Sequence, residues 1–198
     1  EIVAMYSKDA EFRVYCNACW YSDKWDANCF ARDYDFSKSF FAQFKELLKV
    51  IPRPALIGSK NIDSPYVNYT ADDKNCYLCT GCGDGVEDSA YIYRTLNSKD
   101  VFDGFVVLDS NYVYENINCI KNSRLFFSQN SENSLERAFT YNCKNVSNCI
   151  GCVNLRNKNN NIFNQQYTKE DYNKLVTSDY DIGSYSKTTK IKERFMKF

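Results

Sequence analysis

The fold is indicated by the twelve residues KNVSNCIGCVNL, which occupy positions 144–155 and are followed by a similar start at Arg156-Asn157. Each such unit opens with a charged residue and then Asn or Asp, and continues into a short run with β-forming residues. The copies start at Lys74-Asn75, Glu87-Asp88, Lys99-Asp100, Lys121-Asn122, Glu132-Asn133, Lys144-Asn145 and Arg156-Asn157, with a weaker copy at Ser110-Asn111. A period of about eleven to thirteen residues over this length predicts a repeat architecture, in which each unit buries its apolar face against its neighbours.

Apolar residues within the units indicate the type of repeat. Five residues after each Asn or Asp the side chain is often apolar, as at Tyr93, Phe105 and Ile150, and the residue two positions earlier is apolar in several units. Such spacing is typical of strands with one buried face, and short strands between Asn, Asp and Ser turns predict a β-solenoid. We therefore predict a mainly β protein, a parallel β-helix-like solenoid of about 12-residue units in which two units, about 24 residues, form one coil. Asn tolerates the left-handed backbone of tight corners, and stacked Asn side chains can form ladders.

The N-terminal part of the chain is expected to form two further segments. Residues 1–35 contain two β-forming runs, at 1–6 and 12–15, that predict a strand pair at the start of a partial zinc-ribbon module. Residues 36–72 hold a helix over 36–51, where apolar residues recur at helical spacing, and a connector that begins after two Pro residues end the helix.

The repeat array is predicted over residues 73–165, and a C-terminal helical segment over 166–198. The capping box Thr168-Lys169-Glu170-Asp171 predicts a short helix. The basic amphipathic residues 187–198 are expected to cover the open end of the solenoid, because an uncovered strand edge invites pairing with other chains.

Composition excludes several function classes. The chain has 198 residues, no net formal charge, no His and ten Cys. Zero net charge gives no bulk attraction to nucleic acid or to anionic membranes, and no apolar run is long enough for a transmembrane helix. Without His, Ser-His and Cys-His catalytic pairs are excluded within this chain, and any metal site depends on Cys, Asp, Glu or water. The C-x-x-C spacings favour reduced thiols and an intracellular setting over a disulfide framework.

The strongest chemical pattern is the pair Cys16 and Cys19. A C-x-x-C after a hairpin, followed here by Trp20, is typical of one knuckle of a structural zinc site. A zinc ribbon has two knuckles, so the other is expected just before Glu1; Cys29 is a further candidate ligand with a spacing that is not diagnostic. The alternative is a reduced or redox-active pair, although no βαβ setting for a thioredoxin-like motif is visible.

Seven further Cys residues lie in the array. They are Cys76, Cys79, Cys82, Cys119, Cys143, Cys149 and Cys152. Cys76 occupies the place that Ser89, Ser123 and Ser134 hold in other units, and small Cys and Ser side chains fit a narrow coil interior. We therefore interpret the array cysteines as packing residues, and we leave open a second metal or iron–sulfur site and disulfides.

Acidic and aromatic residues suggest two other functions. The carboxylates in or near the turns are Asp84, Glu87, Asp88, Asp100, Asp103 and Asp109. Stacked acids on a parallel β-helix could bind calcium or act on a polysaccharide, whereas acids at corners are more often solvated turn residues. The N-terminal aromatics near Lys24 and Arg32 could stack single-stranded bases, but such residues more often form the hydrophobic base of a zinc ribbon.

Four stretches carry a resemblance to other sequences. They are VYCNACWYSDKWD at 14–26, RDYDFS at 32–37, PRPAL at 52–56 and CIGCVNLRNK at 149–158. Together they resemble uncharacterised zinc-ribbon proteins with an Asn/Cys-rich β-solenoid repeat tail, from uncultured bacteria and phages. The resemblance spans nearly the whole chain and implies a first C-x-x-C before Glu1, further repeats after Phe198, and a cytoplasmic or phage-associated location. It implies no established activity.

The sequence therefore predicts a non-enzymatic structural or binding protein, with a zinc-stabilised module and a rigid solenoid scaffold. Structural zinc at Cys16 and Cys19 is the expected cofactor, and protein assembly partners are favoured over membrane or nucleic acid. The alternatives are a carbohydrate-active or calcium-dependent enzyme on a parallel β-helix, and a nucleic-acid-binding protein that uses the zinc module.

Overall fold

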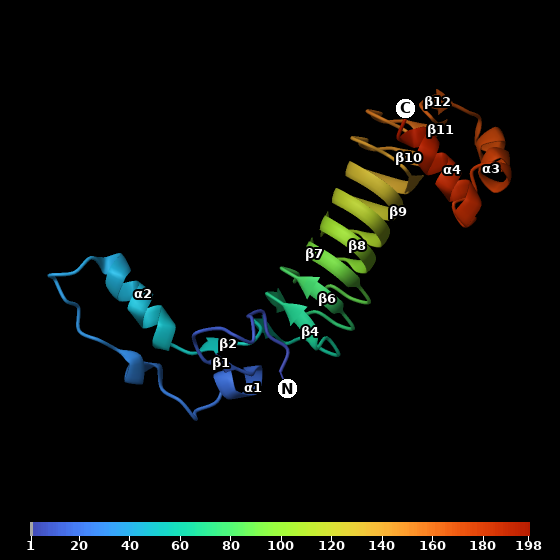
Figure 1. The fold of residues 1–198 in the computed structure, drawn as a ribbon. Helices are drawn as coiled ribbons and strands as arrows, with labels where there is room; N and C mark the ends of the chain where they lie inside the picture. The colour runs from blue at the N-terminus through green and yellow to red at the C-terminus, as the bar shows by residue number, and fades with distance from the viewer. Residues whose placement is uncertain (1) are drawn as a thin grey trace. The chain divides into compact units, whose positions relative to one another are not determined.

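The computed structural model describes residues 2–198, which form two compact units, one up to Gly58 and one over Ser59–Phe198. Glu1, the first residue of a predicted strand, lies outside the described residues. The first unit contains β1 (Val14–Tyr15), α1 (Asn17–Trp20), the 3-10 helix η1 (Ala27–Phe30), α2 (Phe40–Val50) and β2 (Arg53–Pro54). The chain then forms β3 (Gly58–Ser59), β4 (Tyr66–Asn68), β5 (Thr70–Ala71), β6 (Tyr77–Thr80), β7 (Ala90–Leu96), β8 (Lys99–Leu108), β9 (Asn111–Ala138), β10 (Ser147–Ile150), β11 (Asn159–Ile162), β12 (Gln165–Gln166), α3 (Lys169–Ser178) and α4 (Tyr185–Phe195) (Figure 1).

The second unit is a β-solenoid, which confirms the fold class predicted from the repeat. Its main sheet has the strand order β12-β11-β10-β9-β8-β7-β6-β4, and Figure 1 shows the coils stacked along the unit. From β7 to β11, strands pair in parallel with partners twelve residues apart, as in Val101↔Val113 and Phe105↔Ile117, whereas β6 and β7 are offset by thirteen residues, as in Tyr77↔Ala90. One coil therefore corresponds to a single unit of the repeat, and the prediction of two units per coil is wrong.

Each coil is built from short sides of three residues. In the coil that contains β8, φ is 54° at Asp103 and 57° at Val106, and the residues that follow them, Gly104 and Val107, are buried. The same alternation of a left-handed corner and an inward residue recurs every third position through the array. A left-handed backbone is uncommon outside Gly, Asn and Asp, so the corners explain why Asn and Asp are frequent here.

Small polar side chains line the interior and bond to the backbone of the corners. The hydroxyl of Ser89 donates to the carbonyl of Glu87 (2.6 Å) and accepts from the backbone N–H of Val101 in the next coil (3.1 Å). Thiols also donate to the backbone carbonyl of the residue two positions earlier, as Cys79 does to Tyr77 (3.4 Å). Because these bonds satisfy buried backbone groups, the arrangement agrees with the interpretation of the array cysteines as packing residues.

Asn side chains at the corners form ladders on the outside of the solenoid. The Asn118 amide donates to Asn130 (2.9 Å), and the Asn142 amide donates to Asn154 (2.7 Å). Each bond joins equivalent corners of successive coils, because the partners are twelve residues apart. The ladders expected from stacked Asn are therefore present, and they connect neighbouring coils outside the sheet hydrogen bonds.

The C-terminal helices pack on the flank of the later coils. Thr168 caps α3, as the capping box predicted. Tyr172 of α3 and Ile191 of α4 are buried against a cluster that includes Phe139 and Ile150 of the solenoid. At the end of the array β12 pairs antiparallel with β11. The amphipathic segment that was expected to cover the open end thus packs on a side of the solenoid. The strand that pairs with β11 at that end is β12.

The array begins within the segment predicted to be a connector. Ile62 pairs in parallel with Lys74, and Tyr66 with Tyr77, so the first coil precedes residue 73. The helix predicted over 36–51 forms as α2. Ser39 caps it by accepting from the backbone N–H of Ala42 (3.3 Å), and the helix ends just before two Pro residues.

The strand pair predicted for residues 1–15 is absent from the described part of that segment. The backbone N–H of Arg53 donates to the Arg13 carbonyl (2.9 Å), and the N–H of Met5 donates to the Ala55 carbonyl (2.9 Å). Residues 53–55 thus bond to both of the runs that were expected to pair with each other, and β1 pairs in parallel with β2. The zinc-ribbon hairpin is therefore not confirmed.

Candidate functional site

Cys16 and Cys19 lie together at the start of α1. Cys16 is the N-cap residue, and its Sγ accepts from the backbone N–H of Cys19 (3.4 Å). This bond, together with one from the Cys19 thiol, holds the pKa of Cys16 below its usual value, while the same thiol contact raises the pKa of Cys19. Because a metal binds the thiolate form, the surroundings of Cys16 favour a ligand role.

Two thiols supply half of the ligands that a tetrahedral zinc ion needs. Cys29 in η1 is also an exposed free thiol. Within residues 2–198, however, no group of three or more Cys, Asp or Glu side chains is already arranged to hold a metal ion. Cys16 and Cys19 are suitable donors, and zinc at this pair stays a prediction.

The N-terminal aromatic residues pack against one another. The Trp25 ring lies 4.7 Å from the Trp20 ring and 5.7 Å from the Tyr15 ring, measured between centroids. The indole N–H of Trp25 donates to the Trp20 carbonyl (2.9 Å). The rings therefore form a small aromatic cluster, and this packing leaves their faces less suited to stacking bases.

The array cysteines are buried free thiols. Burial raises the pKa of Cys82 and that of Cys119 to about 11, so both are neutral thiols near pH 7. In this state they act as weak hydrogen-bond donors to the corner carbonyls and as small apolar fillers.

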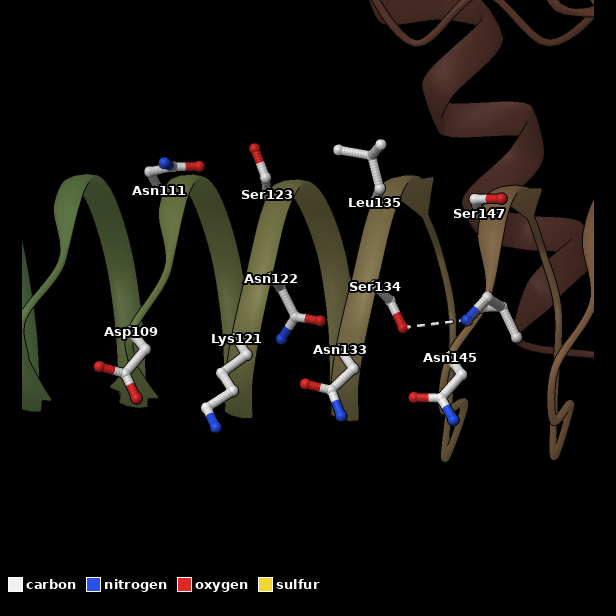
Figure 2. Close-up of a pocket in the computed structure, with 11 residues that line it drawn as sticks. Asp109, Asn111, Lys121, Asn122, Ser123, Asn133, Ser134, Leu135, Asn145 and Ser147 are labelled. Carbon is white, nitrogen blue, oxygen red and sulfur yellow. Dashed lines mark hydrogen bonds between the residues drawn. The ribbon is translucent and has the colours of Figure 1, made fainter.

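A shallow trough of about 610 Å³ crosses several coils of the solenoid (Figure 2). Two rows of side chains border it, one formed by Asp109, Lys121, Asn133 and Asn145, and the other by Asn111, Ser123, Leu135 and Ser147. Members of a row are twelve residues apart, so each coil contributes one residue to each row. We call this feature the polar trough.

Backbone geometry fixes both rows of the polar trough. The first row occupies left-handed corners, as shown by φ of 50° at Asp109 and 48° at Asn133. Each residue of the second row comes directly after an inward residue in the sequence, as Leu135 comes after Ser134. Between the rows, the Ser134 hydroxyl accepts from the backbone N–H of Val146 (3.2 Å), a bond drawn in Figure 2. The floor is therefore held by bonds between coils.

The polar trough is close to neutral and rich in amides and hydroxyls. It contains one cation, Lys121, and one carboxylate, Asp109, which accepts from the Asn97 amide (2.7 Å). A pair of carboxylates for glycoside hydrolysis is not among its lining residues. Elsewhere on the corners, Asp88 accepts from Asn75 and pairs with Lys99, contacts that lower the pKa of Asp88. These acids therefore serve as corner residues.

Sequence reasoning missed the polar trough. The pattern that could have found it is the recurrence of polar residues at a step of twelve, from Asp109 through Lys121 and Asn133 to Asn145. The charged-Asn pairs, meaning the charged residue and the Asn or Asp that open each unit, concealed this step. Lys121 is the first residue of such a pair, whereas Asn133 and Asn145 are the second residues of theirs. Asp73, which is fully buried, was also overlooked, because it directly precedes Lys74-Asn75, the first charged-Asn pair of the repeat.

Comparisons of the chain with models of protein families and with curated proteins find no match. The resemblance to zinc-ribbon proteins with a β-solenoid tail therefore stays a prediction. Across residues 2–198, none of the helices has both the length and the apolar character that crossing a bilayer requires.

Proposed function

We propose that this protein is a non-enzymatic binding scaffold whose polar trough binds an extended, uncharged glycan. The observation that carries the proposal is the pair of rows that present one residue each per coil. Successive coils are about 4.8 Å apart, so amide and hydroxyl groups recur at a short fixed step along the trough. A polymer whose hydroxyl groups also recur along its length can bond to several coils at once.

The chemistry of the polar trough favours a glycan over nucleic acid or a peptide. Nucleic acid binding relies on a surplus of Lys and Arg, whereas here Lys121 is balanced by Asp109. A peptide strand would need unpaired backbone groups at a sheet edge. On this flank the backbone bonds to neighbouring coils, as the N–H of Glu132 does to the Cys143 carbonyl (3.2 Å). Leu135, which is 45% exposed, offers an apolar contact for the C–H face of a sugar ring.

The same proposal assigns zinc at Cys16 and Cys19 a structural role in the first unit. The hydrogen bond that the Cys16 sulfur accepts from the backbone N–H of Cys19 supports this assignment, because it favours the thiolate that zinc binds. Metal analysis of the purified protein and of Cys16→Ser tests it. We expect one zinc ion fewer per chain in the variant, and an unchanged zinc content would contradict the assignment.

Glycan binding is tested by affinity electrophoresis in gels that contain neutral polysaccharides, at low and high salt. We expect retardation on at least one polysaccharide, little changed by salt because the contacts are uncharged. Asn133→Asp adds a charge inside the polar trough and should weaken retardation several-fold. Asn130→Asp is a matched control, because Asn130 has the same left-handed corner conformation and lies outside the trough.

Two results would overturn the glycan proposal. One is the absence of retardation on every neutral polysaccharide tested. The other is an equal loss for Asn133→Asp and Asn130→Asp, which would place the binding surface elsewhere. Strong, salt-sensitive retention on RNA or DNA would instead support the nucleic-acid alternative.

A further inference from the structure

One coil near the start of the array directs an acid and three thiols into its interior. Its inward residues are Asp73, Cys76, Cys79 and Cys82, three positions apart, and none is more than 4% exposed. Cys76, Cys79 and Cys82 belong to one cluster of buried side chains, and the pKa of Cys79 is raised by its neighbours Cys76, Cys82 and Asp73. The four side chains therefore face one another across the interior. We call this group the acidic thiol ring.

Burial of Asp73 outweighs the backbone contact, with Val86, that favours its ionised form. The side chain is 0% exposed, and neither carboxylate oxygen has a hydrogen-bond partner. At the equivalent place in later coils, Ser98 and Ser110 each donate to a backbone carbonyl (2.7 Å). A carboxylate cannot donate in this way, and an isolated buried charge is strongly unfavourable. A cation at the centre of the ring would supply the missing partner.

Within the described residues the four donors do not already surround a metal position, but the coil is wide enough for them to reach one ion when the thiols turn inward. A side of three residues spans about 10 Å, so the backbone lies about 5 Å from the axis, which one Cys side chain and a Zn–S bond of about 2.3 Å can cover together. Because a coil also rises about 4.8 Å per turn, the four donors are staggered along the axis and need not be coplanar. Three sulfurs and one oxygen suit a tetrahedral Zn²⁺ ion better than Ca²⁺ or Mg²⁺, which prefer oxygen ligands only.

We infer that the acidic thiol ring is a zinc site inside the solenoid. In the structure each thiol donates to a backbone carbonyl, for example Cys76 to Lys74 (3.4 Å) and Cys82 to Thr80 (3.5 Å). Binding turns the three sulfurs toward the axis, exchanges these bonds for Zn–S bonds and releases three thiol protons to water. Asp73 binds as the ionised carboxylate. The site is independent of the polar trough and of the glycan proposal.

One coil precedes the ring within the described residues. Two of its inward residues, Asn61 and Ser64, are half-buried, and the other two, Val67 and Thr70, are buried. Asn61 accepts from the backbone N–H of Asp73 (3.1 Å), and Ser64 accepts from that of Cys76 (2.9 Å). The neighbours of the ring on that side are therefore mostly polar, and Val67 packs with its three cysteines.

The test uses the full chain with Cys16, Cys19 and Cys29 all changed to Ser, which removes every exposed thiol. The protein is kept reduced, treated with chelator and titrated with Zn²⁺ and with Co²⁺. We expect one ion per chain, a higher melting temperature with Zn²⁺, and the intense near-ultraviolet sulfur-to-cobalt absorption of thiolate ligands. In this background Cys79→Ser and Asp73→Asn should weaken zinc affinity on the order of 100-fold or more.

Cys152→Ser is the matched control. Cys152 and Cys79 lie on the same side of their coils, and each thiol donates to the carbonyl two residues back (3.4 Å for both). We expect this control to keep the wild-type zinc affinity. Asp73→Asn changes no volume and leaves all three thiols, so it tests the site even if Cys79→Ser fails to fold. The inference is overturned if the triple-Ser protein folds but binds no zinc, or if Cys152→Ser weakens binding as much as Cys79→Ser does.

Discussion

The solenoid contains two groups of buried thiols, and their charged neighbours have opposite signs. The acidic thiol ring near the start of the array includes Asp73. Near the other end, Cys143, Cys149 and Cys152 cluster with Val146, and Arg137 interacts electrostatically with the three thiols. Both groups place Cys on the same three sides of the coil. The fourth side carries the acid in the first group and Val146 in the second, so the difference between the groups is one of charge and not of thiol geometry.

Burial opposes both charges; the guanidinium of Arg137 has one hydrogen-bond partner, at Nη2, while its Nε and Nη1 and both carboxylate oxygens of Asp73 have none. Burial raises the pKa of Asp73 to about 6 and lowers that of Arg137 to about 10, so the arginine keeps its charge at neutral pH. The long side chain of Arg137 also reaches Asn122 in the preceding coil and donates to its amide oxygen (2.8 Å). The short carboxylate of Asp73 has no such reach. The comparison teaches that the second group already contains a cation, whereas the inward residues of the first include a buried acid and no cation.

The largest effect is expected when the second group is converted into the first. Arg137→Leu with Val146→Asp removes the resident cation and places a carboxylate on the side of the coil that Asp73 occupies. Without metal, this double variant should lose about 3–5 kcal/mol of unfolding free energy, because a buried charge is left unpaired. With zinc it should recover most of that loss and bind one more ion than the parent. Urea unfolding and metal analysis measure both effects, with Arg137→Leu alone as control; a double variant as stable as this control without metal would contradict the comparison.

A smaller effect is expected from the pH dependence of the chelator-treated protein. The folded-state pKa of Asp73, about 6, lies above its ordinary value of 3.8, so the ionised carboxylate destabilises the folded state above pH 6. This destabilisation, about 3 kcal/mol at pH 8, should disappear as the pH falls toward 4. Asp73→Asn should therefore be the more stable protein at pH 8 and lose that advantage at pH 4. The neighbouring Cys82 thiol, with a pKa of about 11, does not titrate in this window.

Zinc should reverse the sign of the Asp73→Asn effect. At pH 8 the substitution stabilises the metal-free protein but removes a ligand from the zinc-loaded one, which should then melt at a lower temperature than wild type. Thermal unfolding with chelator and with zinc measures both. If Asp73→Asn has the same sign in both conditions, Asp73 is not a ligand.

The smallest effect is expected at Cys143 in the second group. Its thiol donates to the Tyr141 carbonyl (3.5 Å), a role that Ser131 on the same side of the preceding coil fills with a hydroxyl that donates to the Gln129 carbonyl (3.3 Å). Cys143→Ser should therefore change the unfolding free energy by no more than about 1 kcal/mol. Cys143→Ala, which leaves that carbonyl without the donor, should cost more. Equal losses for the two variants, measured by urea unfolding, would show that the hydrogen bond contributes little.

The sequence predicted the solenoid because Asn and Asp mark its corners, but it predicted the wrong coil length. The expectation of two units per coil came from treating the units as strands whose side chains alternate with a period of two. The actual period is three, visible in the small inward residues Val107, Ser110 and Val113. The charged-Asn pairs also do not stay on one corner of the coil: Lys99-Asp100 lies on one corner, and Lys144-Asn145 lies on the preceding corner. Because of this shift, three successive steps of the charged-Asn pairs are eleven residues long, which conceals the step of twelve that the coils keep from β7 onward.

The candidate sites were less predictable than the fold. The polar trough depends on which residues share a side, and this follows only once the coil length is known. Asp73 looks like an ordinary acid in a connector, because burial cannot be read from a single residue type. The N-terminal strand pair was wrong for another reason: residues 53–55, far along the chain, bond to both predicted strands, and such a long-range partner leaves no local pattern.

The central claim is that one coil takes a single repeat unit and directs one side chain inward from each of its sides. Spin labels at Asn111 and Asn159 test it most directly, because both positions are exposed and lie on the same side of the solenoid. We predict a distance of about 19 Å between these backbone positions by electron–electron double resonance, since they are four coils apart at about 4.8 Å per coil. A coil of two units would also place them on one side but only about 10 Å apart, and a measured distance near that value would contradict the account.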